Sequence, residues 1–314
     1  MFWGFLSVGL CEEKRIKSYK DSIPESLNLA LLVFAVFSTI AFLFLSSRTD
    51  NWVLKFTFAI LFSYSNNTIF SLLHESVHSL FHSTQAINNW AGRIAAAFFP
   101  TGFMFQRVCH LGHHSRNRTN AELFDYYQKG ENRTLKYLQW YGILTGIYWL
   151  LAPLACILYL LFPSFFNVSG KTSKIYKQTG ANAMLSGFES APTIQIRLEI
   201  LFTIFIQTSV FVLLGISFSD WFLCYFAFAL NWCSLQYADH AWSPLDIKNG
   251  AWNLRVNKLV QYIFLNYHHH LAHHQHPEVS WIHLPSYVDF EKTRPYFWKI
   301  YLKMWLGPRP YPSQ

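Results

Sequence analysis

Four long runs of apolar residues divide the chain, and more polar segments separate them. The runs 26–47, 51–73 and 137–162 are each long enough for one membrane crossing, which takes about 20 residues of helix. The fourth run, 200–238, is too long for one crossing and is interrupted by the polar stretch SFSD at 217–220. This pattern predicts an all-α integral membrane protein with four transmembrane helices. We expect them to form two hairpins, 26–73 and 200–238.

Positive charges predict which ends of these helices face the cytoplasm. The cluster Lys14, Arg15, Lys17 and Lys20 precedes the first run, and lysine and arginine are enriched in cytoplasmic loops. The N-terminus is therefore expected in the cytoplasm. The second helix then returns to the cytoplasmic face and ends at His74.

Whether the run 137–162 crosses the membrane fully decides on which face the later histidines lie. The segment after it, 163–199, carries the basic residues Lys171, Lys174, Lys177 and Arg197. Because these charges also indicate the cytoplasm, we expect 137–162 to enter and leave the membrane on one face. His240 then lies on the same face as His74. A single straight crossing by 137–162 is the alternative interpretation.

A re-entrant path needs a bend within the run. Pro153 marks the expected bend, because proline removes a backbone donor from a helix. Gly142 and Gly146 would ease the path.

Composition agrees with a membrane protein. Of 314 residues, 52% are hydrophobic and 13% are charged, and the charged fraction is about half that of a soluble protein. The formal charge of +8 indicates basic surfaces for the cytoplasmic side, an anionic lipid or an acidic protein partner. No basic helix or basic–aromatic repeat is present, so nucleic acid is not an expected partner. The five cysteines form no CxxC pair, which predicts reduced packing residues.

The fourteen histidines all lie between 74 and 283, outside the apolar runs. Most fall into groups with helical spacing. Two groups share the pattern HxxHH, at 110–114 and 270–274, and a pair four residues apart precedes them. The histidines of these groups, with one more after the last apolar run, are His74, His78, His110, His113, His114, His240, His270, His273 and His274.

This spacing predicts a metal site. Residues three and four apart lie on one face of a helix, and each group follows an apolar run or lies near its end. Neutral imidazole is a ligand for iron, copper, zinc and nickel. Eight or nine ligands exceed the four of a zinc site, so at least two metal ions are expected.

Other histidines are not assigned as ligands. His82, His268 and His269 are expected beside the site or exposed, and His276 and His283 are interpreted as ordinary surface or core residues. HESVH at 74–78 also matches the HExxH zinc-protease motif, with Glu75 as general base. A protease would not need the second and third histidine groups.

The three groups resemble the histidine boxes of the membrane-bound fatty acid desaturase and hydroxylase superfamily. Its pattern is HxxxH or HxxxxH, then HxxHH, then a later HxxHH. Its desaturases carry one extra ligand histidine about thirty residues before the third box, and His240 occupies that position. The stretch HHLAHHQHPEVSWIHLP at 269–285 is similar to the superfamily's ending. The resemblance covers roughly residues 26–290.

This resemblance implies a cytosolic helical cap in which the nine histidines above hold two iron ions (Fe2+/Fe3+), with O2 as co-substrate. The chain has no HPGG motif of a fused cytochrome b5 domain. Electrons would therefore come from an external donor of the ferredoxin, rubredoxin or cytochrome b5 type. Gln236 stands where some members have an asparagine that binds metal through water, which puts that contact in doubt.

Outer residues would orient the ligands and line a path for substrate. The candidates for orienting the imidazoles are Glu75, Asp239, Asn117, Asp125 and Asn266. The apolar stretch AAAFFPTGFMF at 95–105 is too short to span the membrane. It is a candidate wall for a tunnel that holds a hydrocarbon chain, and ordinary helix packing is the alternative.

We expect one desaturase-like domain, 1–314, made of consecutive parts. These are an N-terminal interfacial segment (1–25), the first hairpin (26–73), boxes one and two (74–136), a membrane-associated insertion (137–199), the second hairpin (200–238), and the third box with the C-terminal region (239–314).

The function expected first is an O2-dependent fatty acid desaturase that acts on an acyl-lipid or acyl-thioester. A hydroxylase or ketolase of a carotenoid or another lipid has the same histidine pattern and stays open. A histidine-rich metal transporter is disfavoured, because transporters place ligands near the bilayer midplane. The expected location is the bacterial inner membrane or the endoplasmic reticulum, with the site on the cytoplasmic face.

Overall fold

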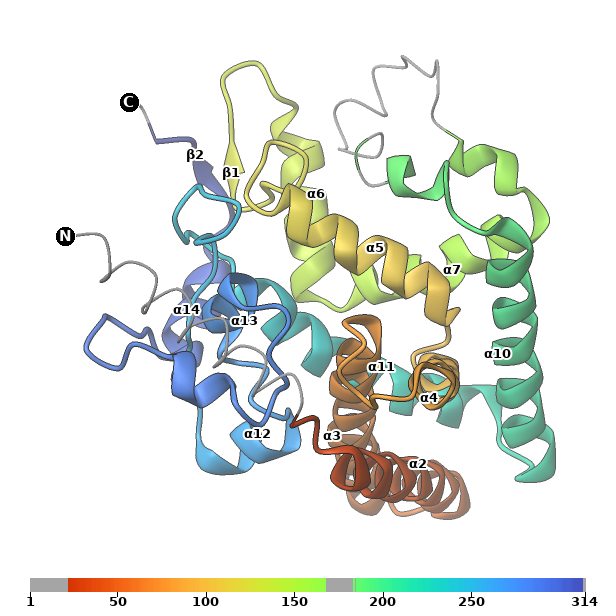
Figure 1. Cartoon of the computed structure of the whole chain (residues 1–314). Helices are drawn as coiled ribbons and strands as arrows, with labels where there is room; N and C mark the ends of the chain where they lie inside the picture. The colour runs from red at the N-terminus through yellow and green to blue at the C-terminus, as the bar shows by residue number, and fades with distance from the viewer. Residues whose placement is uncertain (1–21, 168–182, 184, 313–314) are drawn as a thin grey trace, which may run out of the picture.

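The computed structural model describes residues 22–167, 183 and 185–312, which are mostly helical (Figure 1). The basic residues at 14–20, Lys171, Lys174 and Lys177 lie outside the described residues, as does most of the expected interfacial segment. Four long helices occupy the apolar runs. They are α2 (Glu25–Arg48), α3 (Trp52–Val77), α10 (Thr193–Leu213) and α11 (Phe218–Ala238).

Two described helices, α2 and α10, are long and apolar enough to cross a membrane by themselves. A bent pair of shorter helices passes the same test as one unit, which gives up to three spans. The other two predicted spans, α3 (from the run 51–73) and α11 (from the run 200–238), do not pass this test. Both carry polar side chains that form hydrogen bonds inside the bundle. Asn66 of α3 donates to the carbonyl of Phe98, and Asn231 of α11 donates to the hydroxyl of Ser63.

Helices α2 and α3 form the packed pair expected from the first two runs. Asn51 caps α3 by accepting hydrogen bonds from the amides of Val53 and Leu54. One stripe of α2 is buried, with residues three and four positions apart, as one face of a helix requires. The opposite face exposes large side chains such as Phe34 and Phe37, as lipid contact requires.

Helices α10 and α11 are joined by a short turn that ends at Ser217, which caps α11 by accepting from the Asp220 amide. The break therefore lies at 214–217 and overlaps the expected SFSD only at Ser217. Beyond the turn, α10 packs against α4 (Gln85–Phe98), α5 (Phe103–Arg116) and α7, whereas α11 packs against α3. Helices α10 and α11 therefore pack mainly against other helices and not along each other.

The run 137–162 is bent, but the predicted position of the bend is wrong. Helices α6 (Arg133–Leu144) and α7 (Ile147–Leu161) meet at 94°, and the break lies at Thr145 and Gly146. Pro153 lies inside α7. Gly146 makes the bend because its φ of 79° is left-handed, a conformation that turns the chain and favours glycine.

The remaining elements are short. They are η1 (Pro163–Phe166), η2 (Ser186–Phe188), α12 (Lys258–Ile263), α13 (His270–Gln275), η3 (Leu284–Tyr287) and α14 (Phe297–Met304). The strands β1 (Tyr126–Tyr127) and β2 (Arg309–Pro310) pair in parallel, so the end of the chain lies beside the loop after the second box (Figure 1). The described cysteines are free and are buried or half-buried, as predicted; Cys11 lies outside the described residues.

A buried polar contact joins the start of α2 to the segments that carry histidines. The side chain of Asn28 donates to the carbonyl of Phe81 (2.9 Å) and accepts from the indole nitrogen of Trp281 (2.9 Å). Because buried amides cost free energy unless they are bonded, this contact fixes the position of residues after the first and third boxes.

The two glycines near the bend allow a direct test of its geometry. Gly146→Ala would place a Cβ 3.0 Å from the Leu230 amide nitrogen at a left-handed φ, which costs about 1–2 kcal/mol. Gly142→Ala meets nothing within 4 Å and should stabilise α6 by about 0.5–1 kcal/mol. The midpoint temperature of thermal unfolding in detergent should therefore fall for Gly146→Ala and rise for Gly142→Ala. Equal shifts would contradict the bend at Gly146.

Candidate metal centre

The first box lies where α3 ends. His74 is in the last turn of α3, and His78 is the C-cap residue, whose backbone amide donates to the carbonyl of His74. Ser79 follows with a φ of 62° and turns the chain away. The two rings therefore project from one side of the helix end.

The second box occupies the last turns of α5. Its spacing places His110, His113 and His114 on one side of the helix. The start of α5 is held by α10, because the Glu199 carboxylate accepts from the Met104 amide (2.6 Å). The apolar start of α5 is therefore fixed against α10, and this fixes the direction in which the three imidazoles at its other end project.

The third box forms α13, a helix of only six residues. Isolated helices of this length are unstable, so tertiary contacts must hold it. The Ala272 amide donates to the side chain of Asn253 (3.0 Å), and the Leu271 amide donates to the Trp252 carbonyl (3.3 Å). His240 follows α11, and its backbone amide donates to the Tyr237 carbonyl.

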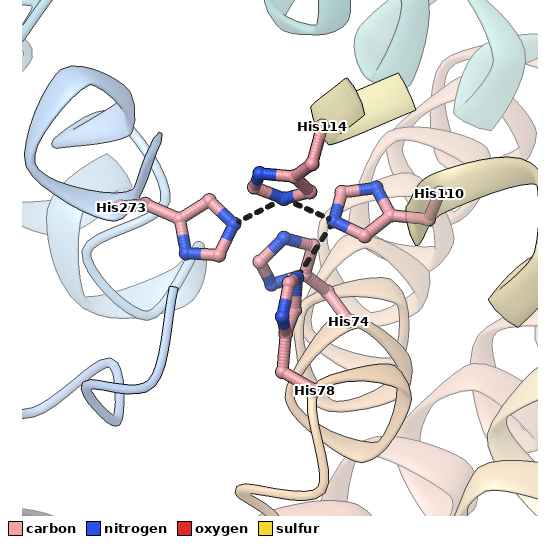
Figure 2. Close-up of side chains that lie close together, drawn as sticks. All are labelled: His74, His78, His110, His114 and His273. Carbon is pink, nitrogen blue, oxygen red and sulfur yellow. Dashed lines mark hydrogen bonds between the residues drawn. The ribbon is translucent and has the colours of Figure 1, made fainter. Parts of the chain in front are cut away.

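The nine histidines selected from the sequence gather into two groups in the structure. Within each group, one nitrogen from every ring lies within 4.8 Å of the others. The first group comes from α3, α5 and α13, and Figure 2 shows its rings converging. It contains His74, His78, His110, His114 and His273. The second group contains His113, His240, His270 and His274.

Several ring nitrogens within these groups lie at hydrogen-bonding distance from two neighbouring rings at once. His110 Nε2 lies 2.9 Å from His78 Nε2 and 3.1 Å from His114 Nε2. His270 Nε2 lies 3.0 Å from His240 Nε2 and 3.2 Å from His274 Nε2. A neutral imidazole nitrogen carries either a proton or a lone pair, so it satisfies one neighbour at a time.

These distances fit metal binding. Nitrogen ligands lie about 2.0–2.1 Å from a metal ion, and two of them at right angles are then about 3 Å apart. Burial holds the pKa values of His110, His270 and His273 well below the usual range, with neighbouring histidines adding to the effect. Neutral rings are the form that binds metal. The buried Nε2 of His74 has no hydrogen-bond partner, so its lone pair is available as a further metal ligand. The residues therefore fit two metal ions, and their role as ligands stays a prediction.

Hydrogen bonds on the outer nitrogens orient the second group. His240 Nδ1 donates to the carbonyl of Gly250 (2.8 Å). His113 Nδ1 donates to the Glu122 carboxylate (2.5 Å), which also accepts from Arg116 Nε (3.0 Å). Each bond places the proton on Nδ1 and leaves the lone pair on Nε2. Glu122 was missed in the sequence, since its separation from the second box follows no helical spacing.

The expected orienting residues act in different ways. Asp239 is buried beside two of the nine histidines, 3.8 Å from His240 Nε2 and 3.7 Å from His270 Nδ1. Glu75 lies 3.9 Å from His74 Nδ1 but accepts hydrogen bonds from Ser280 and the Trp281 amide. It therefore ties box one to the segment after box three.

The other candidates support loops at a greater distance. Asn117 donates to the carbonyls of Ile247 and Gly250, and so holds the loop that binds His240. Asp125 forms a buried ion pair with Arg118 (2.8 Å). Asn266 donates to the Trp281 carbonyl. The side chain of Gln236 accepts from the Tyr267 hydroxyl (3.0 Å).

The remaining histidines lie outside both groups. His268 and His269 are buried with ring centroids 3.9 Å apart. His82 lies 3.5 Å from the Glu25 carboxylate, and His276 contacts the ring of Tyr287. His283 bonds to Ser22.

A cavity of about 370 Å³ opens on both histidine groups. His110 and His113 line it from α5, and His240 and His270 line it from the other side. Phe99 and Phe105 from the predicted wall segment also line it, with further apolar residues of α7 and α11. A largely apolar cavity with a few polar groups at one end is typical of a binding site for an apolar ligand.

Comparison with known proteins agrees with this geometry. No curated protein matched the chain. The sequence model described as fatty acid desaturase matches residues 50–306, which include all three boxes and His240. The chain therefore belongs to the fatty acid desaturase family.

Proposed function

We propose that this protein is an O2-dependent desaturase that holds two iron ions and introduces a double bond into a fatty acyl chain. One observation carries the proposal. A largely apolar cavity opens on two neighbouring groups of buried and half-buried imidazoles. Family membership supports an oxidoreductase, and the shape of the site supports the choice of an alkyl chain.

Each group would hold one ion. The five imidazoles of the first group come from all three boxes, and the four of the second include His240. When bound, the two iron ions supply the O2-dependent oxidation of an unactivated C–H bond, which side chains alone cannot perform. Burial favours the neutral form of His110, His270 and His273, and hydrogen bonds on the Nδ1 atoms of His113 and His240 turn their Nε2 atoms inward.

The cavity walls would position the substrate. Phe70, Phe99 and Trp232 form an aromatic cluster that lines the cavity beside Tyr267. An alkyl chain is stabilised there by about 0.8 kcal/mol for each buried methylene group. This contact would hold one part of the substrate's alkyl chain against His110 and His270. It favours an acyl-lipid or acyl-thioester over a polar substrate.

The overall reaction sets the need for a donor. Desaturation removes two hydrogen atoms from the substrate and reduces O2 to two waters. It therefore takes two further electrons and two protons from outside. We propose an external electron donor of the ferredoxin, rubredoxin or cytochrome b5 type.

We also propose that α2, α3, α10 and α11 all cross the membrane and that α6 and α7 are re-entrant. Gly146, at the bend, lies against Ala229, midway along α11. The far end of α7 returns to the start of α10, where the Tyr159 hydroxyl bonds to Thr193 (3.3 Å). These contacts support a path that enters and leaves on one face. The histidine boxes would then lie at the cytoplasmic face of a bacterial inner membrane or an endoplasmic reticulum.

Metal content tests the role of Glu122. Purified protein should contain about two iron ions per chain. Glu122→Gln removes the charge that orients His113, so the affinity of the second group should fall by about 10- to 100-fold. After dialysis against a chelator, iron in Glu122→Gln should fall toward one per chain. Glu278→Gln, which alters a carboxylate near His276 outside both groups, should keep two. A single zinc ion in the unaltered protein, or full iron in Glu122→Gln, would contradict the assignment.

Product analysis tests the reaction. In a host that lacks desaturases, the protein should yield lipids lighter by two hydrogen atoms, detected by mass spectrometry, and only when O2 is supplied. His273→Ala removes a ring of the first group and should abolish the product. His283→Ala lies outside both groups and should retain it. A product that gains oxygen would support the hydroxylase or ketolase alternative, and a product formed without O2 would exclude both.

A further inference from the structure

Helix α14 and the two residues that follow it carry a stripe of exposed apolar residues. The exposed fractions are 54% for Trp298, 59% for Leu302, 43% for Trp305 and 79% for Leu306. The first three are four and three residues apart and so lie on one side of a helix. The opposite side is buried through Ile300 and Met304.

Two lysines flank this stripe. Lys299 and Lys303 are exposed and four residues apart, so they form a row beside the apolar one. The amine of Lys299 lies 5.4 Å from the ring centroid of Trp298. No acidic residue occurs between 290 and 314 except Glu291. The stripe and the two lysines, Trp298, Leu302, Trp305, Leu306, Lys299 and Lys303, are called the α14 surface below.

The position of the α14 surface is fixed by the re-entrant arm. The Trp140 indole donates to the Met304 carbonyl (2.7 Å), and the Tyr141 hydroxyl donates to the Trp305 carbonyl (3.1 Å). Both aromatic residues belong to α6, five to six positions before the bend at Gly146. Helix α14 also packs against α11. It is therefore attached to the side of two elements that enter the membrane in the proposed topology.

We propose that the α14 surface lies in the cytoplasmic leaflet, in contact with anionic phospholipid headgroups. The apolar stripe enters the boundary of the acyl chains, and the two lysines contact headgroup phosphates. This combination of tryptophan, leucine and lysine on one short helix is typical of interfacial helices, and tryptophan is enriched at that depth. The inference rests on the topology proposed above and not on the reaction.

Charge and continuity favour lipid over another occupant. A second copy of the chain would bring its own lysines against Lys299 and Lys303, and like charges repel. An acidic soluble protein would satisfy the lysines but not the neighbouring leucines and tryptophans. An anionic leaflet satisfies both rows at once and is continuous with the proposed surroundings of α6 and α11.

Spin labelling of the intact protein in lipid nanodiscs tests the proposal. A nitroxide on Leu302→Cys should collide more with O2, which concentrates in lipid, than with a water-soluble nickel chelate. The same label on Lys129→Cys, on an exposed loop, should show the reverse. The unsubstituted protein, treated in parallel, gives the background from its own cysteines. Dominant nickel collisions at position 302 would overturn the proposal, as would spin–spin coupling between copies.

The anionic contact has its own control. Replacing part of the phosphatidylcholine with phosphatidylglycerol should move the Leu302→Cys label deeper. The added pair Lys299→Glu and Lys303→Glu should abolish that shift, whereas the charge-matched pair Lys129→Glu and Lys248→Glu should preserve it. A shift equally lost in both pairs, or absent in all of them, would overturn the role of the two lysines. None of these measurements depends on iron or turnover, so they fail or succeed separately from the proposed reaction.

Discussion

The convergence of nine imidazoles in a buried space is the constraint on which the rest of this structure depends. Neutral rings tolerate burial better than charged ones, but their inner nitrogens lie 2.9–3.2 Å apart in several pairs. Hydrogen bonds among them cannot satisfy every nitrogen. Under the proposed function, two cations shared among the rings would resolve that conflict, which would explain why so many histidines are held so close together.

The fold meets this constraint by fixing each histidine from outside the site. Two of the boxes stand at the ends of helices anchored in the apolar bundle, and the third lies on a helix too short to be stable alone. Glu75 links box one to Trp281, and Asn117 holds the loop whose Gly250 carbonyl orients His240. These polar contacts are buried, so loss of one partner would leave another unsatisfied. The geometry of the site and the stability of the surrounding segments are therefore coupled.

The sequence predicted the features that depend on local spacing. Apolar runs located the long helices. The repeated HxxHH pattern, the pair His74 and His78, and the family resemblance at His240 together identified the nine histidines that the structure brings together. Features set by distant contacts were not predictable. The bend occurs at Gly146 and not at Pro153, because the close approach of α11 requires a left-handed glycine there. Glu122 reaches His113 through the path of a loop, and the packing of α10 on α4 depends on the whole bundle.

The central claim is that the two histidine groups bind two iron ions at separate positions. Anomalous X-ray scattering from crystals of the purified protein, measured on both sides of the iron absorption edge, tests it most directly. The account predicts two iron peaks, one among the rings of His74, His78, His110, His114 and His273 and one among His113, His240, His270 and His274. A single peak shared by all nine rings, or peaks that persist below the iron edge as zinc would give, would contradict it.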